Sequence, residues 1–382
     1  MRKRPHPRTS FALVCLTGAV ILAMMIWSGC GNDQSKDPAS PELTGDNALY
    51  SPANQRIQEV MAIQDAYTTE LMKNPLIVGT ATGLTENGEP AVLVFAAEEL
   101  RAGSVPATLD GVPVRVQVTG KLIARKGPPG GGGQPHTASQ TPPIQLGTSG
   151  GWRYDLANGY CCGGTLGSLI SKGGTQYVLS NWHVLYSDIV NGGNGRTAQP
   201  GDAVIQPGLI DVNCNQNNAQ NVATLVSGGG SLPSANVDAG IAQVIPGMVR
   251  TDGAILEIGT ISSSTVGASI GQAVKKSGRT TGLGRASVTG LNASVQIAYE
   301  NECAGGSAFT KTFTGQIITS NSRCSFLDGG DSGSLMVEDV TTNPRAVGLL
   351  FAGSVSCNNS SIAIANPIGS VLSYYGATMV GN

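Results

Sequence analysis

The chain has 382 residues, of which only 13% are charged, 40% are hydrophobic and 53 are glycine. So few charges exclude a coiled coil or a long solvated helical array, and the hydrophobic share argues against charge-driven disorder. A formal net charge of −2 argues against the basic footprint of a nucleic-acid binder, so we expect no nucleic-acid partner. Frequent glycine with few charges is typical of a β-rich protein with many tight turns.

Residues 1–30 have the pattern of a signal or lipoprotein segment. Basic residues at positions 2, 3, 4 and 8 precede an uncharged, largely apolar run over 11–27. Small residues then precede Cys30, which resembles a bacterial lipobox with Cys30 as the lipidated residue, although Trp27 stands where an aliphatic residue is usual. An uncleaved signal anchor and ordinary cleavage stay open. All three alternatives predict an exported protein that is either held at the membrane or extracellular.

Cysteine usage agrees with export. Six cysteines remain after Cys15 in the apolar run and Cys30, and an even number in an exported chain predicts disulfides. A metal site is disfavoured because no C-x2-C pair occurs and one histidine lies among these cysteines. We therefore expect no metal and no cofactor. The disulfide candidates are Cys161, Cys162, Cys214, Cys303, Cys324 and Cys357.

A small α+β domain is expected over residues 53–125, after a polar tether over 31–52. Apolar spacing predicts a helix from about residue 54 to 74, and Asn-Gly at 87–88 between apolar runs predicts a hairpin. Alternation predicts a further strand over 112–118. This domain contains neither His nor Cys, so we expect it to be a packing domain or a pro-domain.

Residues 126–147 are rich in Pro and Gly and are interpreted as a linker, in which His136 is expected to be solvated. Over 148–382, short β-branched runs recur between Gly, Asn, Asp and Pro, which predicts an all-β sandwich or barrel. The expected strands include residues 177–179, 203–205, 222–225, 241–245, 288–297, 313–318, 335–337 and 347–351.

The segment Asp-Gly-Gly-Asp-Ser-Gly-Ser at 328–334 carries the strongest functional signal. Glycines beside Ser332 allow a tight turn that exposes the hydroxyl and lets backbone N–H groups converge on one point, as in an oxyanion hole. A serine hydroxyl needs a neighbouring base to act as a nucleophile. His6 lies in the signal segment and His136 in the expected linker, so His183 is the candidate base.

Asp238 best fits the third group of a catalytic triad, which orients the imidazole and stabilises its cation. It opens an apolar strand, where partial burial of the carboxylate is expected. The alternatives Asp188, Asp202, Asp211 and Asp252 lie mostly in turn-like contexts. An esterase with a Gly-x-Ser-x-Gly elbow does not fit, because its serine lies between a strand and a helix and its histidine comes last.

The order His183, Asp238, then Gly-Asp-Ser-Gly around Ser332 resembles the trypsin-like (chymotrypsin-fold) serine peptidases, in particular a bacterial exported branch. The resemblance covers about residues 144–378 and implies two six-stranded β-barrels, divided near residue 252, with the site in the cleft between them. Other strings that carry it lie at 164–167, 179–181, 206–211, 276–282 and 348–353.

Carried over residue by residue, the resemblance makes Ser332 the nucleophile, His183 the general base and Asp238 its orienting group. It implies that the backbone N–H groups of Gly330 and Ser332 form the oxyanion hole. It further implies that the strand Phe351-Ala352-Gly353 lines the substrate channel and pairs with a bound peptide.

The resemblance also implies disulfide pairings. Cys324 would pair with Cys357, with Cys303 as a competitor for Cys324. Either Cys161 or Cys162 would pair with Cys214 in the first barrel.

This sequence departs from the family pattern in three places. No Ile-Val-Gly-Gly precedes Trp152, so either another group inside the chain or a different processed terminus must satisfy Asp331. Ser334-Leu335 follows Gly333, where relatives usually have Gly-Pro or Ser-Pro. Phe326 stands in place of the acid typical of trypsins, which disfavours Arg or Lys specificity.

The sequence as a whole predicts an exported serine endopeptidase that hydrolyses peptide bonds in proteins or peptides through an acyl-enzyme. The alternative is a catalytically inactive peptidase-fold binding module on the cell envelope. The oligomeric state, the activation route and the physiological substrate are left open.

Overall fold

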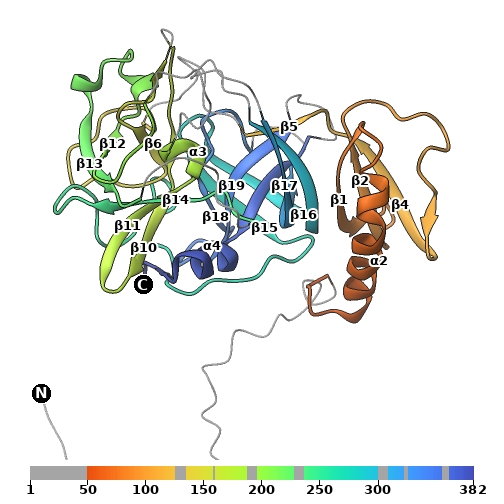
Figure 1. Cartoon of the computed structure of the whole chain (residues 1–382). Helices are drawn as coiled ribbons and strands as arrows, with labels where there is room; N and C mark the ends of the chain where they lie inside the picture. The colour runs from red at the N-terminus through yellow and green to blue at the C-terminus, as the bar shows by residue number, and fades with distance from the viewer. Residues whose placement is uncertain are drawn as a thin grey trace, which may run out of the picture. The chain divides into compact units, whose positions relative to one another are not determined.

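The computed structural model describes residues 50–124, 135–157, 160–186, 196–227, 236–299, 309–321, 326–354 and 361–382. The described residues belong to one compact unit (Figure 1). The signal segment, Cys30, Cys303, Cys324, Cys357 and Asp188 lie outside the described residues. The expected lipidation of Cys30 and the Cys324–Cys357 pairing therefore stay predictions.

The first part of this unit is the small α+β domain. Its elements are α2 (Gln55–Leu71), β1 (Ile77–Leu84), β2 (Pro90–Ala96), β3 (Thr108–Leu109) and β4 (Val112–Val118). The Asn54 side chain caps α2 by accepting from two backbone N–H groups of its first turn. The predicted helix, hairpin and strand are confirmed, and Gly88 has the positive φ of 82° that the hairpin turn requires.

The first barrel closes through six strand positions. Its sheet has the order β10-β11-β14-β13-β12-β6-β9, and only Gly167 separates β9 from β10, so these two act as one bent strand that closes the ring. Its strands are β6 (Thr148–Trp152), β9 (Gly164–Leu166), β10 (Ser168–Lys172), β11 (Thr175–Ser180), β12 (Ala203–Gln206), β13 (Gln220–Leu225) and β14 (Gly240–Val244).

Short elements complete this half of the molecule. The one-turn helix α3 (Trp182–Leu185) follows β11 directly, and β21 (Thr378–Met379) pairs with β10. The remaining short elements are β7 (Leu156–Ala157), β8 (Tyr160–Cys161) and the 3-10 turns Leu209–Asp211 and Gln216–Asn218.

The second barrel is a closed ring of six strands in the order β15-β18-β19-β20-β17-β16, with β16 pairing back to β15. Its strands are β15 (Ala273–Gly278), β16 (Gly282–Tyr299), β17 (Phe309–Ser320), β18 (Leu335–Glu338), β19 (Ala346–Ser354) and β20 (Ala363–Pro367). Seven of the eight expected strands listed by residue range above lie within β11–β13 or β16–β19, and the eighth, 241–245, exceeds β14 by one residue, so all eight are confirmed. The helix α4 (Ile368–Tyr375) after β20 was not predicted.

The small domain continues the sheet of the second barrel, because β1 pairs antiparallel with β16. Buried Gln64 of α2 reinforces this junction by donating to the backbone carbonyl of Asn292 in β16 over 2.8 Å. After β4, the short strand β5 (Leu122–Ala124) lies between the ends of β16 and β19 and pairs with both. In chain order, β5 thus pairs with strands of the second barrel before the strands of the first barrel begin at β6.

Two expectations outside the site have clear outcomes. Cys161, and not Cys162, pairs with Cys214. The prediction that His136 is solvated is wrong, because the residue is only 3% exposed and its Nε2 lies 2.7 Å from Oε2 of Glu257. The nearby Ile144 and Leu146 are also buried, so this end of the expected linker packs against the molecule. Proline and glycine content alone did not indicate that packing.

Candidate active site

His183 lies on α3 and contacts Asp238, which precedes β14. Its Nδ1 is 2.7 Å from Oδ2 of Asp238, and its backbone N–H donates to Oδ1 over 3.3 Å. An ionised carboxylate only accepts hydrogen bonds, so Nδ1 carries the proton and Nε2 is the basic nitrogen. Asp238 is fully buried and His183 is 5% exposed. This arrangement fixes both the ring orientation and the tautomer that a general base needs.

Tyr299, at the end of β16, is a further partner of Asp238 that sequence reasoning missed. Its hydroxyl donates to Oδ2 of Asp238 over 2.8 Å, and its ring meets the His183 ring edge-on at 6.0 Å between centroids. Burial, and then the charge of Asp238, raises the pKa of Tyr299 well above 10. The phenol therefore stays a neutral donor to the carboxylate. Position 299 carried no motif that identified it.

Asn366 of β20 fixes the backbone at Asp238. Its Oδ1 accepts from the Asp238 N–H over 3.0 Å, and its Nδ2 donates to the Asp238 carbonyl over 3.2 Å and to the Leu349 carbonyl over 3.3 Å. Leu349 belongs to β19 of the second barrel, so this one amide joins the aspartate to the strand expected to bind substrate.

Ser332 lies in the turn before β18. Its Oγ donates to the Phe351 carbonyl over 3.4 Å, and its own carbonyl accepts from Thr165 N–H over 2.9 Å. Gly333 follows with φ of +93°, and a Cβ there would collide with the Ser180 hydroxyl and the Thr165 carbonyl. The glycine after Ser332 therefore allows the serine turn to approach the first barrel closely.

The serine turn and α3 are brought together by β9. A Cβ at Gly164 would meet the Val184 side chain of α3 at 2.6 Å and the Ser332 carbonyl at 3.1 Å. Gly164 thus lies between the helix that carries His183 and the turn that carries Ser332. Of the three residues of the expected triad, His183 and Asp238 lie next to strands of the first barrel, and Ser332 precedes a strand of the second.

Asp331 is fully buried, and its carboxylate is satisfied within the chain. Lys276 of β15, also fully buried, forms an ion pair with it at 3.1 Å. The N–H groups of Thr280 and Thr281 donate to its Oδ1, and the Thr281 hydroxyl donates to its Oδ2 over 2.7 Å. The question left open by the sequence is therefore answered by an internal lysine, and the turn is held without a processed N-terminus.

The described alternatives to Asp238 have other partners. Asp202 accepts from the Trp152 indole over 3.0 Å, and Asp252 pairs with Arg250 at the surface. Asp211 forms a buried bidentate ion pair with Arg279, whose Nε and Nη2 donate to Oδ2 and Oδ1 over 2.8 and 2.6 Å. Asp238 is the one that contacts His183.

A cavity of about 50 Å³ lies beside Ser332, and β5 forms part of its wall. Gly353 pairs antiparallel with Ile123, and Ser354 with Leu122, so β5 pairs with the C-terminal end of the strand that was expected to bind a peptide. Phe326 does not line this cavity, because it is buried in the core of the second barrel. The lining residues are Ile123, Leu327, Asp328, Gly329, Ser332, Ala352, Gly353 and Ser354.

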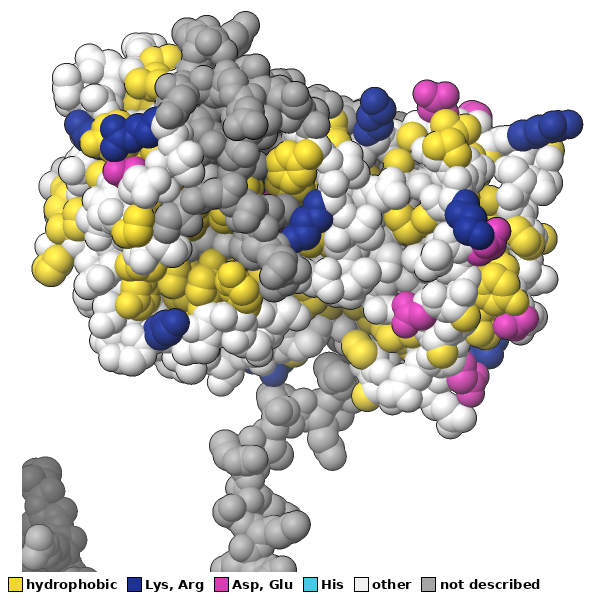
Figure 2. Space-filling view, in the orientation of Figure 1, with side chains coloured by type: hydrophobic (Ala, Val, Ile, Leu, Met, Phe, Trp, Pro, Cys, Tyr) yellow, Lys and Arg dark blue, Asp and Glu magenta, His cyan; other side chains and the backbone are white. Residues whose placement is uncertain are grey.

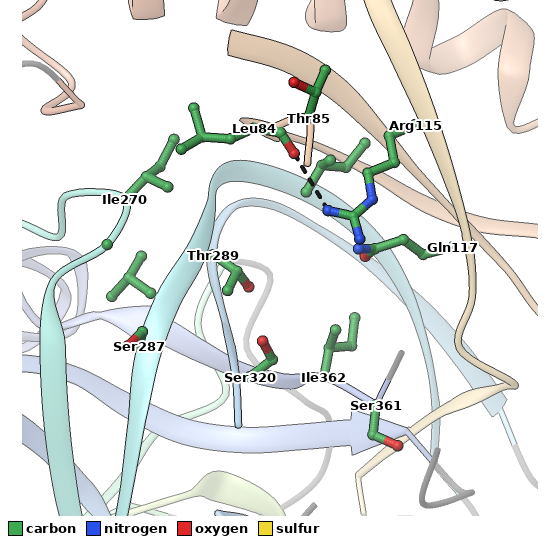
Figure 3. A pocket seen from close by; sticks show the side chains of 13 residues that line it. Leu84, Thr85, Arg115, Gln117, Ile270, Ser287, Thr289, Ser320, Ser361 and Ile362 are labelled. Atoms are coloured by element: carbon green, nitrogen blue, oxygen red, sulfur yellow. Dashed lines mark hydrogen bonds between the residues drawn. The ribbon is translucent and has the colours of Figure 1, made fainter. Parts of the chain in front are cut away.

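A larger cavity of about 300 Å³ lies between the small domain and the second barrel (Figure 3). Arg115 of β4 extends over it and donates to the Leu84 carbonyl at 3.5 Å. Its lining contains no histidine, cysteine or carboxylate, so the described residues there offer neither a general base nor a metal ligand.

The surface adds little to this picture. Figure 2 shows the visible Lys and Arg side chains of the described residues scattered rather than gathered. Among the described residues, no group of three or more His, Cys, Asp or Glu side chains is arranged to hold a metal ion. Over the same ranges, no helix is long and apolar enough to cross a membrane.

Comparisons with known proteins show what the chain is similar to. A family model described as the Nal1 C-terminal domain matches residues 212–367. Streptogrisin-A of Streptomyces griseus is 38% identical over 111 residues, which are 29% of this chain and 31% of that protein. The match thus spans less than two thirds of this relative.

Similar solved structures include a glutamic acid-specific serine protease with 20% identity, covering 62% of this chain and 100% of that chain at a TM-score of 0.41. Another is Protease A of Thermobifida fusca, with 21% identity, covering 63% and 99% at a TM-score of 0.40. The streptogrisin-A match and the two six-stranded rings together confirm the expected class: the chain has the trypsin-like (chymotrypsin) fold of serine peptidases, preceded by a small α+β domain.

Proposed function

We propose that this protein is an exported serine endopeptidase, with Ser332 as nucleophile, His183 as general base and Asp238 as the group that orients it. The observation that carries this proposal is the 2.7 Å contact between His183 Nδ1 and buried Asp238. His183 lies on α3, and Gly164 of β9 lies between this helix and the Ser332 turn. The similarity to streptogrisin-A supports a hydrolase of this type.

In the proposed reaction, Nε2 of His183 takes the proton of Ser332 Oγ as that oxygen attacks the substrate carbonyl. The N–H groups of Gly330 and Ser332 stabilise the resulting oxyanion. His183 then gives the proton to the leaving amine, and an acyl-enzyme remains on Ser332. Water, activated by the same nitrogen, releases the acid product.

The edge of β19 is the proposed binding strand for the peptide substrate, over Phe351-Ala352-Gly353. Its supporting observation is β5, which pairs antiparallel with Gly353 and lies beside Ser332. Since β5 is the last strand within the small domain of residues 53–125, we infer that this domain is an inhibitory pro-domain whose last strand fills the substrate groove. Protein or peptide chains that bind in extended form are then the substrate class.

Export is part of the proposal. The Cys161–Cys214 disulfide fits an oxidising compartment, and the basic and apolar pattern over residues 1–30 supplies the signal. We propose Cys30 as the lipid anchor at the cell envelope. Mass spectrometry of the mature N-terminus tests it: a first residue of lipidated Cys30 supports the anchor, and a free terminus elsewhere refutes it.

Reaction with a fluorophosphonate probe tests the catalytic proposal. The wild-type chain should be labelled, and Ser332→Ala and His183→Ala should each abolish labelling. Ser104→Ala removes an exposed serine of the small domain and serves as the matched control. If the wild-type chain stays unlabelled both before and after release of the small domain, the inactive binding module is the better description.

A further inference from the structure

The peptide bond between Gly329 and Gly330 is fixed by a side chain from the connection between β15 and β16. The Thr280 hydroxyl donates to the Gly329 carbonyl over 2.7 Å. This peptide bond is trans, so its C=O and N–H point in opposite directions. The Gly330 N–H therefore points away from Thr280. It is also one of the two donors of the proposed oxyanion hole.

This hydrogen bond has one possible direction, because a carbonyl oxygen can only accept. A second contact to the hydroxyl comes from Arg279. Its Nη1 lies 3.2 Å from Thr280 Oγ1, and a guanidinium group can only donate. The Thr280 oxygen therefore accepts from Arg279, and its single proton goes to the Gly329 carbonyl. Because the donor cannot be reversed, the carbonyl is held in one orientation.

Arg279 is itself held by the first barrel. Its Nε and Nη2 donate to both carboxylate oxygens of Asp211, with Arg279 fully buried and Asp211 7% exposed at the side chain. The backbone of Thr280 is fixed independently, since its N–H donates to Asp331 Oδ1 over 2.9 Å. The position of Thr280 is thus fixed by two independent contacts, at its side chain by Arg279 and at its backbone by Asp331.

The next peptide bond is held by the same principle. Thr165 Oγ1 accepts from the Arg279 backbone N–H over 2.9 Å, so its proton goes to the Gly330 carbonyl, which lies at 2.8 Å. Two threonine hydroxyls from different barrels therefore fix two successive carbonyls of the turn. Of these, only Thr280 acts on the peptide that carries the proposed oxyanion donor.

Resting on the proposed function, we propose that Thr280 is a positioning residue for catalysis, which through the Gly329 carbonyl directs the Gly330 N–H toward the substrate oxyanion. Loss of its hydroxyl leaves the Gly329–Gly330 peptide free to rotate, so the donor is lost in a fraction of molecules. Because the oxyanion exists only in the transition state, the effect falls on kcat and not on KM.

The experiment compares Thr280→Val with Thr280→Ser in the chain purified in its fluorophosphonate-reactive form. The valine variant should lower kcat about 10- to 100-fold, below the roughly 100- to 1,000-fold cost of deleting a donor outright. Its KM should stay within about twofold, and the serine variant should retain most of the wild-type kcat because it keeps the hydroxyl. Affinity for a peptide aldehyde, whose hemiacetal mimics the oxyanion, should fall in parallel with kcat.

Thr319→Val is the matched control, because this buried hydroxyl also donates to a backbone carbonyl, that of Ala363, within the same barrel. It should leave kcat unchanged. The inference is overturned if Thr280→Val has the same kcat as Thr280→Ser. It is also overturned if Thr280→Val and Thr280→Ser both lose kcat in proportion to a lower Tm. A wild-type chain that never reacts with the probe refutes the proposed function and this inference with it.

Discussion

Tyr299 donates its hydroxyl hydrogen bond to Oδ2 of Asp238, the same oxygen that lies 2.7 Å from Nδ1 of His183. We expect Tyr299→Phe to lower kcat/KM about tenfold. A hydrogen bond to a charged group is worth roughly 1.5–3 kcal/mol, and part of this is lost as the imidazolium forms. Steady-state kinetics checks the prediction, with Tyr374→Phe, a half-exposed tyrosine, as control. Equal kcat/KM in both variants would contradict it.

The raised pKa of Tyr299 also predicts a pH dependence of stability. In the unfolded chain the phenol ionises near pH 10, whereas burial keeps it protonated to higher pH in the folded chain. Its contribution is therefore fully present below about pH 10 and is lost as the pH rises toward the folded pKa. Denaturant unfolding from pH 8 to 11 should show a shallower alkaline loss of stability in Tyr299→Phe than in wild type. Parallel curves would refute the assignment.

The buried ion pair between Lys276 and Asp331 should be essential to the serine turn. Burial lowers the pKa of Lys276, and the charge of Asp331 opposes this shift. Lys276→Met leaves a buried carboxylate without its cation, so we expect a destabilisation of about 3–5 kcal/mol and loss of probe labelling. Lys172→Met, at an exposed lysine, is the control. The measurement is the free energy of unfolding, and a change below about 1 kcal/mol would show that the Thr280 and Thr281 donors suffice.

Replacement of Asp238 by Asn should lower kcat far more than the same replacement at another aspartate. The amide can donate to Nδ1 and thereby favour the wrong imidazole tautomer, so kcat should fall by about 10⁴. Asp202→Asn, which perturbs contacts with Trp152, Arg196 and the Gln199 backbone, should leave kcat near wild type. A fall of less than about tenfold for Asp238→Asn would mean that another group orients His183.

Weakening β5 should open the proposed substrate groove. Ile123 is 4% exposed and lines the cavity beside Ser332, so Ile123→Asp places an unpaired carboxylate in a buried position. We expect fluorophosphonate labelling of the full-length chain to accelerate about tenfold, the equivalent of 1.4 kcal/mol of lost occupancy. Val116→Asp, at an exposed position of β4, should not change the rate. An unchanged rate in Ile123→Asp would show that β5 does not limit access.

Local pattern predicted the α2 helix and eight of the barrel strands, because alternation and turn residues act over a few positions, but it missed β6, β9, β10, β15 and β20. Asn-Gly at 87–88 required a positive φ, and the structure has it at Gly88. The α4 helix was missed because it is short and follows β20 without a capping side chain, so its sequence resembles another apolar run. His136 was misjudged because the contact that buries it, Glu257, lies 121 residues away.

The sequence by itself determined which residue types were present for the chemistry: one histidine in the β-rich region, a glycine-flanked serine and a limited set of aspartates. Only the tertiary structure decided that Asp238 is the aspartate at His183 and that Lys276 satisfies Asp331. It also decided that Tyr299 contacts Asp238 and that Thr280 contacts the Gly329 carbonyl. The reason is physical. Hydrogen bonds and ion pairs between residues tens of positions apart leave no periodic trace in a sequence, and they form only when two closed barrels bring their strand ends together.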